Sequence, residues 1–113
     1  MNRDAIQKWI DALRSGEYKQ CQGQLRKGNS FCATGVLCDV HSKEFNSKAS
    51  WEDNKYLGNE VSMPMIVQNW INSEIVIGII TMNDGHRMGF NQIADKIEKK
   101  FNILKAKEDA KND

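Results

Sequence analysis

The sequence predicts a small α+β protein, with about four helices and a small β-ribbon or sheet in a single compact domain. Its 113 residues suffice for one domain of ordinary size. Apolar residues recur at helical spacing near both ends, and a short segment of alternating polarity with glycine turns lies between the first two helical patterns. We therefore expect one globular domain over residues 1–104 and a frayed, charged tail over 105–113.

The N-terminal region predicts a helix followed by a ribbon. A single apolar stripe predicts a helix over residues 3–15, which Gly16 is expected to end. The stripe consists of Ile6, Trp9, Ile10 and Leu13. Residues 17–28 then alternate in polarity around Gly23, which predicts two short strands joined by a tight turn.

The stretch FCATGVLCDVH, residues 31–41, predicts a second helix that is buried. Ser30 is expected to cap it by accepting a hydrogen bond from the first turn. The helix is apolar on nearly every side, which is typical of a buried helix. Gly35 would weaken an exposed helix by about 1 kcal/mol relative to alanine. We therefore expect another element to cross close to Gly35.

The rest of the chain predicts a loop, two more helices and a strand. Residues 42–60 read as a long polar loop that Trp51 and Tyr56 hold to the core. Pro64 suits the first turn of the next helix, whose inward-facing residues are expected to be Met65, Ile66, Trp70 and, as a further candidate, Ile71. The β-branched run at 75–82 predicts a buried strand, and the NDG sequence at 83–85 predicts a turn. Residues 89–104 predict a helix with one apolar face.

Charge and composition exclude some classes of protein. The formal net charge is +1, which argues against a broad field for nucleic acid and against an acidic DNA mimic. The local basic cluster of Arg14, Lys19, Arg26 and Lys27 reads as a solvated surface. No apolar run reaches the ~20 residues that span a bilayer, and the charged N-terminal segment does not resemble a signal peptide. Three cysteines, an odd number, favour reduced thiols in a cytoplasm.

Cys32 raises the possibility of a thiol enzyme. A cysteine near a helix N-terminus has a lowered pKa, and a papain-like mechanism would pair it with a histidine. His41 lies about 13 Å further along the same helix and cannot be that partner. His86 is the remaining candidate base. The competing interpretation, which the apolar surroundings favour, is that Cys32 is a small buried hydrophobe.

A metal site is the second chemical alternative. Cys38 and His41 are spaced i, i+3 on the predicted helix, and Cys21 with His86 would have to complete a set of four ligands. Zinc sites usually contain a closely spaced cysteine pair such as C-x-x-C, and the chain has none. We therefore predict no bound metal and no cofactor.

Five separate pieces of the sequence resemble a family of small proteins of tailed bacteriophages. They are the helix and the ribbon within WIDALRSGEYKQCQGQLR, then FCATGVLCDV, MPMIVQNWI and MNDGHRMGFNQIADKIE, and together they extend over roughly residues 6–98. Thr34 stands where these relatives often carry a bulky apolar residue, and GHRMGF is a local variant. The resemblance implies a phage-encoded accessory protein and transfers no catalytic residue.

The sequence thus favours a non-catalytic protein that binds a host protein or a small ligand in the host cytoplasm. We expect the binding surface on the ribbon at 17–28 and the loop at 42–60, because tyrosine, tryptophan and arginine dominate binding hot spots. The expected contact residues are Tyr18, Arg26, Trp51 and Tyr56. Two alternatives stay open: Trp51 and Tyr56 only hold the loop to the core, or the chain is a cysteine-dependent enzyme that uses Cys32 with His86.

Overall fold

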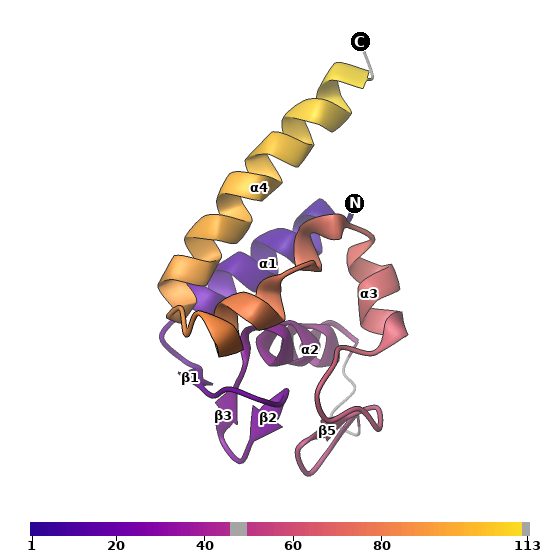
Figure 1. The fold of residues 1–113 in the computed structure, drawn as a ribbon. Coiled ribbons are helices and arrows are strands. Elements are labelled where there is room, and N and C mark those ends of the chain that lie inside the picture. Colours follow the sequence, from indigo (N-terminus) through magenta and orange to yellow (C-terminus); the bar gives the residue numbers. More distant parts are fainter. Residues whose placement is uncertain (46–49, 112–113) are drawn as a thin grey trace.

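Four α-helices, a three-stranded sheet and a small hairpin make up the described part of the chain, residues 1–45 and 50–111 of a computed structural model. The α+β class and the single compact domain are confirmed (Figure 1). None of the helices in these ranges is long and apolar enough to span a membrane. The elements, in chain order, are α1 (Arg3–Arg14), β1 (Lys19–Gln20), β2 (Arg26–Lys27), β3 (Ser30–Phe31), α2 (Ala33–Glu44), β4 (Trp51–Glu52), β5 (Lys55–Tyr56), α3 (Met65–Ile71), η2 (Glu74–Val76), η3 (Thr81–Gly85) and α4 (Phe90–Lys111).

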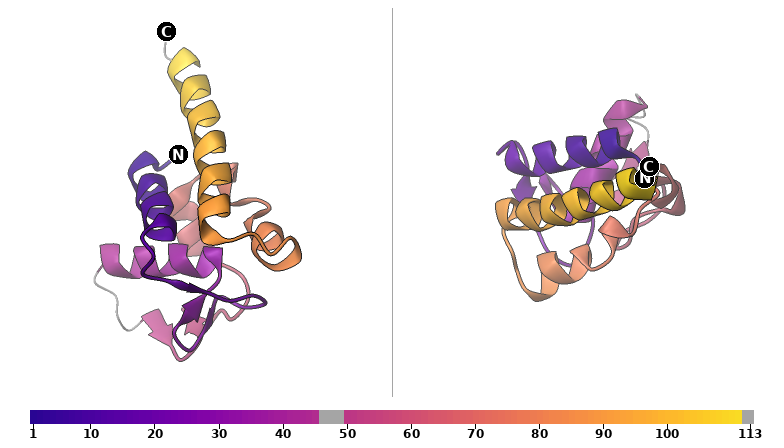
Figure 2. Two further views of the ribbon diagram at one scale, coloured as in Figure 1. Left: turned by 90° about the vertical axis from the view of Figure 1, so that its left-hand side faces the viewer. Right: turned by 90° about the horizontal axis from the view of Figure 1, so that it is seen from above.

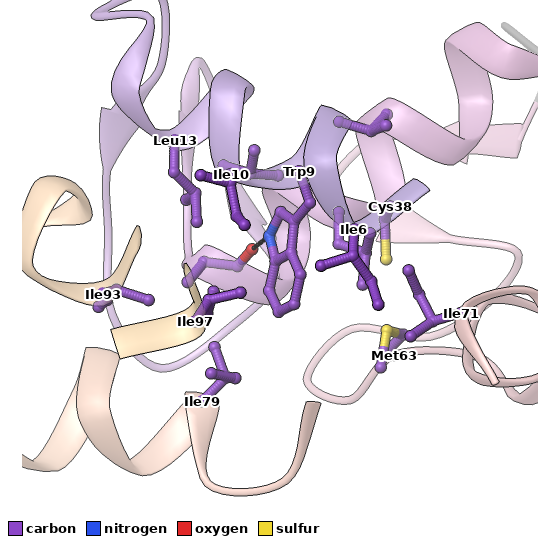
Figure 3. Close-up of a cluster of buried hydrophobic side chains, with 14 of the residues drawn as sticks. Ile6, Trp9, Ile10, Leu13, Cys38, Met63, Ile71, Ile79, Ile93 and Ile97 are labelled. Atoms are coloured by element: carbon purple, nitrogen blue, oxygen red, sulfur yellow. Dashed lines mark hydrogen bonds between the residues drawn. The ribbon is translucent and has the colours of Figure 1, made fainter. Parts of the chain in front are cut away.

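Helix α1 lies at the centre of the core and packs against α2, α3 and α4. Its predicted apolar stripe is buried, and Gly16 follows the helix with a left-handed φ of 77°, as expected of a C-terminal glycine. Trp9 is fully buried, and its indole Nε1 donates to the Ala33 carbonyl at 3.0 Å (Figure 3). This bond joins α1 to the first turn of α2 inside the hydrophobic cluster.

The ribbon crosses the N-terminal end of α2. Strand β3 is central, with β1 parallel on one side and β2 antiparallel on the other. The Leu25 carbonyl, next to β2, accepts a hydrogen bond from the Cys32 amide at 3.1 Å. A Cβ on Gly35 would lie 1.9 Å from that carbonyl oxygen. The expected close crossing at Gly35 is therefore confirmed, and the crossing element is the backbone of the ribbon.

The cap of α2 differs from the prediction. Ser30 belongs to strand β3, where it pairs with β1, and it therefore does not cap the helix. The N-cap is Cys32, whose Sγ accepts from the Gly35 amide at 3.3 Å. Strand pairing extends the chain up to Phe31, and the first residue left to cap the helix is therefore the cysteine.

The segment predicted as a loop over 42–60 contains regular structure. Helix α2 continues to Glu44, and β4 and β5 form an antiparallel hairpin whose turn places Asp53 at a φ of 53°. The Asn54 Oδ1 accepts from the Gly28 amide at 2.9 Å, which connects the hairpin to the turn of the ribbon. The part of the predicted loop at 46–49 lies outside the described residues.

The predicted strand at 75–82 is wrong. The chain forms η2, a turn at Gly78 with a φ of 85°, and then η3, which has π-helical winding. Ile75 and Ile79 are buried while Ile77 is exposed, so burial recurs every four residues. The β-branched run favoured a strand by composition, but no strand within residues 1–45 and 50–111 pairs with it, and the helical burial pattern prevails.

Helix α3 orients its side chains differently from the prediction. Val67 and Ile71 are buried, whereas Met65 and Ile66, expected to face inward, are 66% and 56% exposed. Trp70 is half-buried. The helix has only seven residues, and its contact with the core is the narrow i, i+4 line from Val67 to Ile71.

Helix α4 is longer than predicted and extends beyond the rest of the molecule (Figures 1 and 2). It continues through Lys111, across most of the segment where we predicted a frayed tail. Arg3 of α1 donates to Glu108 at 3.0 Å and to Asp109 at 2.7 Å. Arg14, at the other end of α1, pairs with Asp95. The two helices are therefore antiparallel, and ion pairs join them at both ends.

We predict that Gly35→Ala destabilises the protein by more than about 2 kcal/mol, because the new methyl group would overlap the Leu25 carbonyl and force the ribbon away from α2. Urea denaturation monitored by tryptophan fluorescence measures this loss. Gly85→Ala is the matched control: its Cβ would meet only the Thr81 methyl group, at 3.6 Å, so we expect a change within about 0.5 kcal/mol. Equal stabilities of the two variants would contradict the crossing.

Candidate functional site

Three of the four predicted contact residues surround one aromatic ring, that of Phe31. The Tyr18 ring meets Phe31 edge-on at 5.2 Å, and the Trp51 ring does so at 5.7 Å. The guanidinium of Arg26 lies over both Phe31 and Trp51, at 5.0 and 5.3 Å from the ring centroids. Phe31 is buried, while Tyr18, Arg26 and Trp51 are each half-buried. We call these three side chains the ribbon surface.

Asp39 of α2 holds the ribbon surface from below. Its carboxylate accepts from the Tyr18 hydroxyl at 2.5 Å and from the Trp51 indole at 3.1 Å. Lys43 lies 3.4 Å from the same carboxylate and donates to the Tyr18 hydroxyl at 3.1 Å. Burial, with the Asp39 carboxylate adding to it, raises the pKa of Tyr18. The phenol therefore stays protonated and donating, which keeps its ring in place.

Tyr56 does not belong to this surface. It is fully buried, and its hydroxyl lies 2.6 Å from Nδ1 of His41. Its ring packs against Trp51 at 4.9 Å. The prediction of Tyr56 as a surface residue is wrong because the hairpin turns its side chain onto α2. Tyr56 thus has the alternative role that the sequence left open, that of holding the segment to the core.

A second apolar surface, which the sequence reasoning missed, begins at His41. The buried His41 ring contacts Phe45 at 4.8 Å and Trp70 at 5.0 Å. Phe45 is more than half exposed, and so are Met65 and Ile66 of α3. Helix α3 contains no charged residue, and this was the sequence signal that could have identified the surface.

Cys32 and His86 are not arranged as a nucleophile and its base. Cys32 is buried, and its Sγ contacts Thr34 Oγ1 at 3.2 Å and the Gly35 amide. Burial raises the pKa of the Cys32 thiol, opposing formation of the thiolate that a cysteine enzyme needs. His86 is exposed in the bend before α4, and within the described residues no hydrogen bond joins it to Cys32.

The residues considered for zinc do not form a ligand set either. Within residues 1–45 and 50–111, no three His, Cys, Asp or Glu side chains are grouped so that they could hold one ion. His41 is turned toward Tyr56 and the aromatic rings around it. Cys38 is fully buried, and burial raises the pKa of its thiol.

Asn83, which belongs to the NDG sequence predicted as a turn, is a buried polar residue. Its Oδ1 accepts from the Ala33 amide at 3.1 Å and from the Gln20 side chain at 2.8 Å. Its Nδ2 donates to the Cys21 carbonyl at 2.8 Å. One side chain thus connects η3, the ribbon and the N-terminus of α2, which positions the ribbon surface from behind.

These features define a small α+β domain with a rigid aromatic and arginine surface supported by one partly buried carboxylate. The chain belongs to the family described as a domain of unknown function, DUF8296, whose model matches residues 1–101. No curated protein and no solved structure matches the chain.

We predict that Cys32 and Cys38 resist a thiol reagent in the native protein, because both are buried and their pKa values are raised. Cys21, the least buried of the three at 8% exposure, should be labelled first. Mass spectrometry of the native and the urea-unfolded protein measures the order of labelling. Fast labelling of Cys32 near neutral pH would contradict its role as a cap and would support the enzyme alternative.

The thermal stability should fall as the pH falls below about 6.5, the pKa of an unperturbed histidine. Burial lowers the pKa of His41, so the unfolded chain takes up a proton more readily than the folded one. The contribution of neutral His41 to the free energy of unfolding is present above the pKa that His41 has in the unfolded chain. It is lost as the pH falls through the pKa that His41 has in the folded protein. Melting curves between about pH 5 and pH 8 measure it.

His41→Gln should flatten this dependence, and His86→Gln, which changes an exposed side chain, should preserve it. A pH dependence that survives His41→Gln unchanged would assign the effect to other groups.

Proposed function

We propose that this chain is a phage-encoded accessory protein that acts in the host cytoplasm by binding a host protein, without catalysis. The order of the five sequence pieces that resemble small proteins of tailed bacteriophages supports the phage origin. The observation that carries the binding role is the convergence of Tyr18, Arg26 and Trp51 on the buried Phe31 ring.

The ribbon surface has the features of a binding hot spot. Arginine, tyrosine and tryptophan are the residue types in which interface energy concentrates. Asp39 fixes both Tyr18 and Trp51, so little side-chain freedom remains to be lost when a partner binds. A hollow of about 250 Å³ lies beside Tyr18 and Lys43, between α1 and α2, and offers space for a side chain of the partner.

The charge pattern around the surface favours a partner with acidic groups. Arg26 donates from Nε to the Gly28 carbonyl, which leaves its terminal nitrogens without a bonded partner among the described residues. Lys19 and Lys27 lie in the strands on either side of β3 and are exposed. A carboxylate of the partner could accept two parallel hydrogen bonds from the Arg26 guanidinium while an apolar group contacts Trp51.

The test is affinity capture from lysate of the bacterial host, followed by measurement of Kd for the purified partner. We predict that Arg26→Gln weakens binding by about 1–3 kcal/mol, and that Trp51→Ala does so as well, while Lys27→Gln, on the same strand, changes it little. Melting temperatures separate lost contacts from lost folding. Arg26→Gln should melt close to the native protein, whereas Trp51→Ala should melt lower because the indole bonds Asp39.

Two results would contradict the proposal. Equal Kd values for Arg26→Gln and Lys27→Gln would show that the guanidinium is not a contact. A binding loss that only follows the fall in stability across the variants would assign Tyr18, Arg26 and Trp51 a structural role.

A further inference from the structure

Helix α4 separates its charges onto two sides. Its four acidic residues all pair with α1: Asp95 and Glu98 contact Arg14 at 2.7 and 2.9 Å, and Glu108 and Asp109 contact Arg3 at 3.0 and 2.7 Å. The side of α4 that faces α1 is therefore neutralised by arginines of that helix.

The opposite side of α4 carries lysines. Lys96, Lys99, Lys107 and Lys111 are exposed, and none makes an ion pair within the described part of the chain. At 3.6 residues per turn they lie within about 120° of one another around the helix axis and extend over about 22 Å along it. We call these four residues the lysine face. Lys105 lies outside it, with its ammonium 4.1 Å from the centre of the Phe101 ring.

The net charge of +1 conceals this arrangement. The near-balance of acidic and basic residues argues against nucleic acid only where opposite charges are mixed over the surface. On α4 they are separated, because the acids are held by Arg3 and Arg14 and the lysines are left to solvent.

The position of the lysine face allows a long partner to reach it. The C-terminal part of α4 extends beyond the other elements in Figure 1 and in the left-hand view of Figure 2, so a linear partner can lie along it. Asp95, which pairs with Arg14, is the acid that borders the lysines: at the base of the face it lines a hollow of about 300 Å³ together with Met88, Gln92, Lys96 and Lys99.

We propose that the lysine face binds the phosphate backbone of duplex nucleic acid, without reading its sequence. Lysines along a straight helix match a regular line of negative charge, and such contacts are sequence-independent. This interaction is additional to the ribbon surface and does not depend on it.

The composition of the face favours a duplex over other polyanions. Lysine is depleted in protein–protein interfaces, and it is the most frequent exposed residue of α4. Proteins that bind single strands stack bases on aromatic rings, and the exposed residues of α4 include none. A helix that lies on a membrane needs a broad apolar side beside its lysines. Here the buried apolar residues face α1, and Ile103 is the one large apolar side chain exposed on α4.

The test is fluorescence anisotropy of the full chain with a labelled duplex of about 20 base pairs, at NaCl concentrations from about 50 to 200 mM. We expect weak binding that is independent of sequence. The logarithm of the binding constant should fall with the logarithm of salt with a slope of about −3 to −4, as expected for four phosphate contacts.

The triple variant Lys96→Gln, Lys99→Gln and Lys107→Gln should bind at least about tenfold more weakly and have a slope nearer −1. Glutamine has nearly the helix propensity of lysine, so the variant should keep its melting temperature. The matched control removes the same charge elsewhere, by Lys19→Gln, Lys27→Gln and Lys55→Gln, and should lose much less affinity.

Each of the opposite results would overturn the proposal. These results are an absence of binding at the lowest salt concentration, equal losses of affinity for the two triple variants, and tighter binding of a single strand of the same length. Binding to anionic vesicles but not to the duplex would assign the lysine face to a membrane surface instead.

Discussion

The contact of the Leu25 carbonyl with Gly35 is the constraint on which the rest of the structure depends. Because Gly35 has no side chain, the backbone of the ribbon lies directly on the first turn of α2. The same carbonyl accepts the Cys32 amide, so one oxygen both satisfies the start of the helix and places the ribbon. Phe31, the ring beneath the proposed binding surface, owes its position to this crossing.

Asp39 then joins elements that are distant in the sequence. It lies on α2, and its carboxylate receives hydrogen bonds from Tyr18 next to the ribbon and from Trp51 of the hairpin. A partly buried carboxylate needs such donors, because an unpaired charge in this position would be costly. The hydrogen bonds that stabilise the Asp39 carboxylate therefore also hold the Tyr18 and Trp51 side chains in the orientation that a partner would meet.

The proposed binding surface was predictable by residue type but not by arrangement. Tyrosine, arginine and tryptophan in the region of the ribbon and the following segment directed attention to Tyr18, Arg26 and Trp51. The sequence places Phe31 in the predicted helix and does not indicate Asp39 as a support, since both roles depend on contacts between separate elements. Tyr56 illustrates the same limit: its burial follows from the direction in which the β4–β5 hairpin folds onto α2.

By itself, the sequence determined the helices whose apolar residues repeat on one side, α1 and the first part of α4, and the buried character of α2 with its glycine. Periodicity is a local property, so these elements follow from neighbouring residues alone. Only the tertiary structure decided that residues 75–82 form short helical turns instead of a strand, because a strand requires a partner elsewhere in the chain. It also decided that α4 continues to Lys111 and separates its charges, since Arg3 and Arg14 lie at the far end of the sequence and reach the acids only in the folded protein.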